Sequence, residues 1–106
     1  MTEIAAVTGS ASGIGAAVRA RLEKDGFRVI GVDLQRAEVE TDLSTPDGRR
    51  RAIEGVLAAC NGALDRLVLC AGLGAHVDDL ARVASVNYFG AVDLLDGLRQ
   101  IGRAHV

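Results

Sequence analysis

The chain has 106 residues, of which 49% are hydrophobic and 25% are charged, and its formal net charge is -2. This slight acidity provides no basic surface for nucleic acid, and no apolar run approaches the ~20 residues that a membrane span needs. The amino terminus also lacks a basic segment followed by the apolar core of a signal peptide, so we expect a cytoplasmic, single-domain protein.

The first predicted unit is a strand, a glycine-rich turn and a helix. An apolar stretch at residues 4–7 leads into a turn that contains Gly9, Gly13 and Gly15, and a helical pattern begins at Ile14. Glycine allows backbone conformations and close approaches that a β-carbon would block. The amide groups that open a helix then offer a binding site for phosphate. The alternative, from these residues alone, is a tight turn that binds nothing.

The first helix is expected to bury one apolar face and to end at Gly26. The apolar residues that recur at helical spacing are Ile14, Ala17, Val18 and Leu22. Charged residues, among them Arg19 and Lys24, occupy the opposite face, which we expect to lie in solvent.

The second predicted strand covers residues 27–32 and is followed directly by Asp33. In dinucleotide-binding proteins an acidic residue at about this distance from the glycines binds the adenosine ribose. Only eight residues, 34–41, separate Asp33 from Asp42. A parallel crossover through a helix needs about a dozen residues or more, so we predict that Val39 lies in a short third strand reached by a loop without a helix.

Thr45 and Pro46 predict the start of a second helix, as its N-cap and its first residue. Its buried face is expected to consist of Ile53, Val56, Leu57 and Cys60. The arginine run at residues 49–51 admits a phosphate-binding interpretation, but a solvated helix face is favoured because charge runs normally lie in water. Asn61 and Gly62 are expected to end the helix.

Residues 67–71 predict a fourth strand, whose continuous apolar character indicates that both of its faces are covered. A final helix is expected from about Val86, and its pattern breaks at residues 102–106. Its apolar stripe consists of Leu94, Leu95, Leu98 and Ile101. The two cysteines, Cys60 and Cys70, lie in apolar contexts without metal-ligand spacing, so we expect reduced, buried thiols and no metal site.

The glycine spacing, Thr-Gly-x-x-x-Gly-x-Gly, resembles that of the short-chain dehydrogenase/reductase family. The further segments that agree with this family are Asp42-Leu43, Cys70-Ala71-Gly72 where the family usually has Asn-Ala-Gly, and Val86-Asn87. The match covers nearly the whole chain. The residues around Asp33, Gly72 and Asn87 most resemble the bacterial 3α-hydroxysteroid dehydrogenase/carbonyl reductase branch, which also lacks the helix after the second strand.

The resemblance implies an α/β fold, a Rossmann-type parallel sheet of strand order 3-2-1-4 with helices on both faces in three αβα layers. Residues 1–106 would form a single, incomplete NAD-binding domain, truncated after the fourth strand and the helix that follows it. NAD is the implied cofactor. The residues implied to bind it are Gly9, Ser10, Ser12, Gly13, Ile14, Gly15, Asp33, Asp42, Leu43, Cys70, Ala71, Gly72 and Leu73.

The role of each of these residues is carried over from the family. The glycine-rich loop would lie under the pyrophosphate, Asp33 would bind the adenosine ribose, and Asp42 with Leu43 would edge the adenine. Residues 70–73 would form the turn beside the ribose, where Cys70 in place of the usual asparagine removes a side-chain amide. Asp33 also favours NAD over NADP, because its charge would repel a 2′-phosphate. Arg36 is close enough to weaken this preference, but the acid at the end of the strand is the stronger sign.

The implied activity is that of an NAD-dependent oxidoreductase acting on a secondary alcohol or ketone, with a 3-hydroxysteroid as one candidate. Asn87 matches the catalytic asparagine of the family, and its alternative role is the N-cap of the final helix. The serine and the Tyr-x-x-x-Lys pair cannot be placed, since the sole tyrosine, Tyr88, has Val92 where the lysine would fall. We therefore expect the 106 residues to carry only the cofactor-binding half of the enzyme and to have no catalytic activity. The alternative is a nucleotide-binding or interaction module without catalysis.

Self-association is a further expectation. The family's sheet continues beyond the fourth strand, so that strand would have an unpaired edge here, and the apolar stripe of the final helix would be exposed. We therefore predict a homo-oligomer that associates through the fourth strand or the final helix, with dependence on a missing portion supplied elsewhere as the alternative. A small-molecule alcohol or ketone is the expected substrate of the complete enzyme, and neither nucleic acid nor a membrane is expected as a partner.

Overall fold

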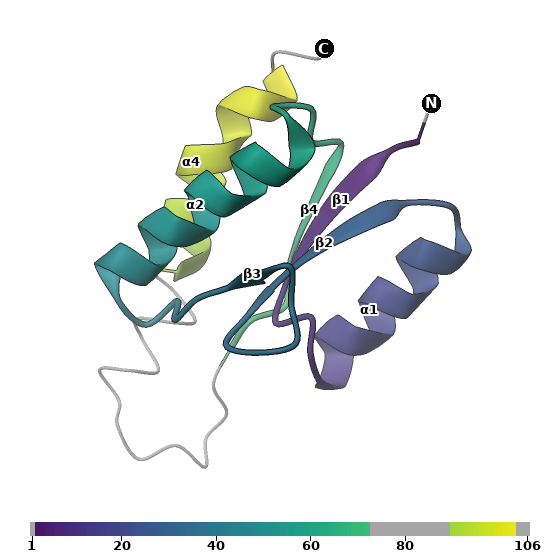
Figure 1. The fold of residues 1–106 in the computed structure, drawn as a ribbon, viewed down its shortest axis with the longest axis horizontal. Helices are drawn as coiled ribbons and strands as arrows, with labels where there is room; N and C mark the ends of the chain where they lie inside the picture. Colours follow the sequence, from purple (N-terminus) through teal and green to yellow (C-terminus); the bar gives the residue numbers. More distant parts are fainter. Residues whose placement is uncertain (1, 73–89, 104–106) are drawn as a thin grey trace.

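The structure, a computed structural model, describes residues 2–72 and 90–103, which form a parallel sheet covered by helices (Figure 1). Within these residues the sheet has four strands in the order β3-β2-β1-β4, as predicted. The strands are β1 (Ile4–Thr8), β2 (Arg28–Asp33), β3 (Val39–Glu40) and β4 (Arg66–Leu69). Because β1 lies between β2 and β4 and is parallel to both, these three strands end at the same edge of the sheet.

Helices lie on both faces of the sheet. They are α1 (Gly13–Lys24), α2 (Pro46–Cys60) and α4 (Ala91–Arg103). α1 lies on one face, whereas α2 and α4 lie side by side on the other (Figure 1). The three layers and the parallel strand order are those of a Rossmann-type α/β fold, which confirms the predicted fold class.

The main core lies between the sheet and the pair α2 and α4. Alternate residues of a strand point to opposite faces, so each strand contributes every second side chain to this core. Its buried members are Ala6, Ile30, Val32, Leu43, Ala52, Val56, Cys60, Leu64, Leu94 and Leu98. The predicted buried face of α2 is confirmed at Val56 and Cys60, while Ile53 and Leu57 are half-buried and pack against the margin of the core.

α2 begins and ends where the sequence predicts. The Thr45 hydroxyl accepts a hydrogen bond from the Gly48 N–H at 2.9 Å, and Pro46 is the first helical residue. At the other end Asn61 adopts the left-handed conformation, with φ of 52°, and its N–H donates to the Leu57 carbonyl. These two local signals fix the length of α2 because each satisfies backbone groups that a helix leaves unpaired at its ends.

We expected the arginine run of α2 to form a solvated helix face, and this expectation is wrong for one of its three residues. Successive residues of a helix are rotated by about 100°, so neighbouring side chains point in different directions. Arg50 and Arg51 are exposed, but Arg49 is buried. Its Nε atom lies 2.6 Å from a carboxylate oxygen of Asp93 on α4, and this acidic partner compensates the buried charge.

The prediction of the buried face of α1 is wrong. Ile14 and Ala17 are exposed, Val18 and Leu22 are half-buried, and Gly15 is the buried residue of this helix. Gly15 packs directly against the Gly9 carbonyl, so the backbone rather than a side chain makes the close contact with the end of β1.

The expectations for α4 and β4 change in part. Leu94 and Leu98 of α4 pack into the core, so the expected exposure of the apolar stripe is wrong for these two residues, whereas Leu95 is exposed. The side chain of Ile101 lies outside the described residues, and α4 continues to Arg103 instead of breaking at residue 102. β4 is shorter than predicted and only half-buried, because among the described strands it pairs with β1 alone.

Residues 34–38 connect β2 to β3 without a helix, as predicted. β3 is two residues long and pairs only with the end of β2, so the chain has to return by only about 7 Å before it pairs.

The Glu38 carboxylate holds the loop between β2 and β3. It accepts hydrogen bonds from the Gly31 N–H at 2.6 Å and from the two terminal nitrogens of Arg19 at 2.8 and 2.7 Å. Arg19, expected in solvent, thus ties α1 to the loop, and its hydrogen bonds lower the pKa of Glu38 to about 2.

We predict that Glu38→Gln lowers the free energy of unfolding in a pH-dependent way. Folding lowers the pKa of Glu38 from 4.5 to about 2, so the ionised carboxylate stabilises the folded state fully above about pH 4.5 and loses this effect as the pH falls toward 2. Urea unfolding near neutral pH should show a deficit of about 1 kcal/mol or less, because the pair is substantially exposed. Glu54→Gln on the solvent face of α2 is the control. A deficit that stays constant down to pH 2 would contradict a role for the ionised pair.

Candidate functional site

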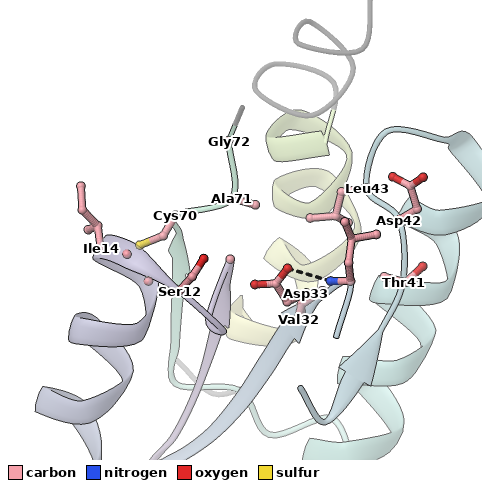
Figure 2. A pocket seen from close by; sticks show the side chains of 14 residues that line it. Ser12, Ile14, Val32, Asp33, Thr41, Asp42, Leu43, Cys70, Ala71 and Gly72 are labelled. Atoms are coloured by element: carbon pink, nitrogen blue, oxygen red, sulfur yellow. Dashed lines mark hydrogen bonds between the residues drawn. The ribbon is translucent and has the colours of Figure 1, made fainter. Parts of the chain in front are cut away.

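The described residues form a pocket of about 390 Å³ at the carboxyl edge of the sheet (Figure 2). In open α/β sheets, ligands bind at this edge, outside the carboxyl ends of the strands. The pocket is lined by Gly9, Ser12, Gly13, Ile14, Gly15, Val32, Asp33, Leu34, Thr41, Asp42, Leu43, Cys70, Ala71 and Gly72. Three stretches of chain that are distant in sequence therefore meet there: the glycine loop, the end of β2 with the segment after β3, and the end of β4.

Two glycines of the loop are required by close contacts. Gly9 has φ of +70°, and a β-carbon built on it would lie 2.8 Å from the backbone nitrogen of Ala71. A β-carbon on Gly15 would collide with the carbonyl group of Gly9. These contacts press the start of α1 against the ends of β1 and β4, which places the amino terminus of the helix at the pocket.

The start of α1 offers uncapped amide groups to the pocket. Ser12 is the N-cap residue, but its side chain makes no capping hydrogen bond. The first N–H groups of a helix have no partner within the helix, and they carry the positive end of its dipole. Gly13, Ile14 and Gly15 all line the pocket, so this part of the site suits an anionic group such as a phosphate.

Asp33, the last residue of β2, lies in the pocket wall directly beside the glycine loop. One carboxylate oxygen accepts a hydrogen bond from the Ala11 N–H at 2.9 Å. The other accepts from the Leu34 N–H at 2.7 Å, the bond drawn in Figure 2. A carboxylate oxygen has two acceptor sites, so each of these oxygens retains one for a ligand hydroxyl. Asp33 therefore both braces the glycine loop and offers acceptors to a ligand.

Thr8 fixes the end of β4 beside the pocket. Its buried hydroxyl oxygen accepts hydrogen bonds from the N–H groups of Cys70 and Ala71, at 3.1 and 3.0 Å. The Cys70 thiol is free and half-buried at the pocket wall, in contrast to the fully buried Cys60. The expectation of buried thiols therefore holds for Cys60 and not for Cys70, whose strand lies at the edge of the described sheet.

The far side of the pocket is the segment that joins β3 to α2. The Asp42 carboxylate accepts hydrogen bonds from the N–H and the hydroxyl of Ser44, at 2.9 and 2.6 Å. Leu43 is 6% exposed and belongs both to the pocket wall and to the core. The rim is thus a tight turn anchored by a carboxylate at one residue and by apolar packing at the next.

The structure brings most of the predicted site residues together, with one exception among those it describes. Ser10 is buried with its hydroxyl against Gly31 of β2, and within residues 2–72 and 90–103 that hydroxyl has no hydrogen-bond partner. Its side chain does not line the pocket, because the turn at Gly9 directs it under the loop. Leu73 and Asn87 lie outside the described residues, as do the predicted start of the final helix at Val86 and the sole tyrosine, Tyr88.

Sequence reasoning missed several pocket and supporting residues. Val32, Leu34 and Thr41 also line the pocket. Each is adjacent in sequence to a predicted site residue, and this adjacency was the signal that would have found them. The supporting roles of Thr8 and Arg49 depend on partners that are distant in sequence, so no local pattern indicates them.

The described part of the chain contains neither a metal-binding cluster nor a membrane-spanning helix. Within it, no three histidine, cysteine, aspartate or glutamate side chains gather closely enough to hold a metal ion. None of the helices in these residues has the length and hydropathy of a membrane span.

Comparison with known proteins assigns this arrangement to a family. The family model for short chain dehydrogenases matches residues 3–101. The chain belongs to the short-chain dehydrogenase family. It is 53% identical over 93 residues to the 3-alpha-hydroxysteroid dehydrogenase/carbonyl reductase of Comamonas testosteroni, in an alignment that covers 88% of this chain and 36% of that enzyme. The chain thus spans about a third of the length of this short-chain dehydrogenase.

Solved structures of short-chain dehydrogenases show the same fold. The 3-alpha-hydroxysteroid dehydrogenase from Pseudomonas sp. B-0831, complexed with NADH, matches with a TM-score of 0.91 and 50% identity, over 93% of this chain and 39% of that one. L-sorbose reductase from Gluconobacter frateurii, complexed with NADPH and L-sorbose, matches with a TM-score of 0.87 and 28% identity, over 98% and 49% of the two chains. These similarities confirm the family and the branch that the sequence predicted.

We predict that Gly15→Ala weakens the binding of NAD, the cofactor expected from the sequence, by at least about tenfold. The added methyl group would collide with the Gly9 carbonyl and displace the start of α1 from the pocket. Titration calorimetry measures the affinity. Gly26→Ala is the matched control: its site has open space but φ of +95°, so it should lower the melting temperature without changing the dissociation constant. Unchanged affinity in Gly15→Ala would contradict the close packing of the loop.

Proposed function

We propose that this chain is the cofactor-binding part of an NAD-dependent oxidoreductase that interconverts a secondary alcohol and a ketone. The observation that carries the proposal is the placement of Asp33 opposite the amide groups of α1 in one pocket. A dinucleotide needs both features, an anion site for its pyrophosphate and an acceptor for its ribose hydroxyls. Because the chain spans only 36% of the Comamonas enzyme, the activity of the whole protein is part of the proposal.

The residues of the pocket fit a dinucleotide in their chemistry. The amides of residues 13–15 would hold the pyrophosphate, and the free acceptor sites of Asp33 would receive the hydroxyls of the adenosine ribose. Asp42 and Leu43 would edge the adenine, and residues 70–72 would form the turn beside the ribose. When bound, the nicotinamide ring would supply or accept the hydride.

Exposed apolar side chains at the pocket support the same assignment. Ile14 is 78% exposed and Leu34 is 57% exposed, although both are large hydrophobic residues, and both line the pocket. Apolar walls combined with a few convergent polar groups are typical of cofactor sites. The planar rings of a dinucleotide would cover these side chains, which water solvates poorly.

Electrostatics favour NAD over NADP. A 2′-phosphate on the adenosine ribose would lie beside the Asp33 carboxylate, and these two negative charges would repel each other. Among the lining residues that the structure describes there is neither arginine nor lysine to accept the phosphate. The Glu38 carboxylate occupies both terminal nitrogens of Arg19, so this guanidinium is committed to the loop between β2 and β3.

A 3-hydroxysteroid is the substrate class that we propose. The support is the 53% and 50% identity to two proteins named for that activity. The serine, tyrosine and lysine of the family's chemistry have no counterpart in the 106 residues, so a segment beyond them would have to supply these groups. Self-association and a cytoplasmic location stay predictions.

We predict at least about tenfold tighter binding of NAD than of NADP. Calorimetric titration with each cofactor measures this ratio directly. Asp33→Asn keeps the shape of the side chain but removes its charge, so it should weaken NAD binding and bring the ratio closer to one. Asp47→Asn, at an exposed position of α2, is the control and should leave both affinities unchanged. Tighter binding of NADP by the unmodified protein would overturn the argument from Asp33.

We also predict that the whole protein reduces NAD when supplied with a 3-hydroxysteroid, whereas residues 1–106 alone give no turnover. The difference follows from the absence of a Tyr-x-x-x-Lys pair in these residues. Nicotinamide absorbance reports the reaction. Steady turnover by residues 1–106 that persists in Tyr88→Phe would show that another group supplies the proton transfer. Dinucleotide binding without turnover by the whole protein would favour the alternative, a nucleotide-binding module.

A further inference from the structure

Among the arginine side chains that the structure describes, Arg49 is the buried one, and its guanidinium contacts two separate parts of the molecule. The Nε atom lies 2.6 Å from Oδ2 of Asp93 on α4. The Nη1 atom donates to the backbone carbonyl of Leu43, at 3.1 Å. One side chain of α2 therefore connects α4 to the rim of the pocket.

The rim depends on side chains for its position because it is irregular backbone. Residues 41–45 follow β3 and precede α2, outside the regular sheet and helix hydrogen bonding. The Thr41 N–H donates to the Asp33 carbonyl at 2.9 Å, and the Thr41 hydroxyl donates to the Gly48 carbonyl at 2.8 Å. At Leu43, the residue that would edge the adenine, Arg49 donates to the backbone carbonyl.

Asp93 in turn fixes the direction of Arg49. A buried guanidinium without a partner is strongly unfavourable, so the side chain is held where an acidic group meets it. The Arg49 side chain is 10% exposed and that of Asp93 is 46% exposed, so the pair lies at the boundary between core and solvent. α4 itself contributes no residue to the described pocket wall. Its influence on the pocket would pass through this ion pair.

We infer that Arg49 is a positioning residue for the adenine end of the dinucleotide site, and that Asp93 makes α4 part of the same support. This inference rests on the proposed NAD site. Loss of the Arg49 guanidinium releases the Leu43 carbonyl and lets the rim move away from the adenine, while the pyrophosphate site at the start of α1 keeps its own contacts. The adenine half of the cofactor is thus affected and the nicotinamide half is not.

The test compares ligands that contain or lack the adenine, in the whole protein. Arg49→Gln should weaken NAD and ADP-ribose by the same factor, about tenfold, because a hydrogen bond from a charged donor is lost. Nicotinamide mononucleotide, which lacks the adenosine, should bind unchanged. Arg50→Gln, the next residue of the run and exposed, is the matched control and should change none of the three affinities. Calorimetry gives the dissociation constants, and melting temperature reports stability separately.

Asp93→Asn provides a second, milder variant in case Arg49→Gln does not fold. It should weaken ADP-ribose in the same direction by a smaller factor, and the double variant should be no weaker than Arg49→Gln alone, since the two residues act as a unit. Wild-type affinity for ADP-ribose in both single variants would overturn the inference, as would an equal loss for nicotinamide mononucleotide. Absence of ADP-ribose binding to the unmodified protein would instead contradict the proposed NAD site.

Discussion

The hydrogen bond between the Asp33 carboxylate and the Ala11 N–H joins the two parts of the molecule on which the pocket depends. Ala11 lies in the glycine loop after β1, and Asp33 ends the neighbouring strand β2. The Gly9 N–H also donates to the Val32 carbonyl of β2, at 2.7 Å, so the loop is bonded to this strand both at Gly9 and at Ala11. The carboxylate also bonds the Leu34 N–H, so one side chain sets the relative position of two loops.

The short connection between β2 and β3 shows how side chains replace an absent element. A helix would normally cover the edge of β2 and satisfy the geometry of a parallel crossover. Here Glu38 accepts from the Gly31 N–H and receives a bidentate pair from Arg19 of α1. Two parallel charge-assisted hydrogen bonds fix both the direction and the distance of the guanidinium relative to the carboxylate. The loop that follows Asp33 is thereby held close to the pocket with few residues.

Support for the pocket comes from both helical layers. On the α1 side, the close packing of Gly15 on Gly9 sets the position of the helix amino terminus. On the other side, α4 packs into the core through Leu94 and Leu98, next to α2, and Arg49 of α2 bonds the Leu43 carbonyl. The carboxyl edge of the sheet is therefore supported by side-chain contacts on the α2 side, and its glycine loop is shaped by backbone contacts.

The sequence alone determined the features that depend on local chemistry. Glycine spacing, the Thr45 cap and the eight residues before Asp42 indicated the first turn, the start of α2 and the missing helix. The resemblance to short-chain dehydrogenases that the sequence motifs carry supplied the strand order and most of the pocket wall. Only the tertiary structure decided which arginine is buried, where Arg19 finds its partner and why Ser10 faces away from the pocket. Each of these outcomes depends on residues that are distant in the sequence. A run of like charges or an apolar helix stripe does not reveal which face will meet Asp93, Glu38 or Gly31.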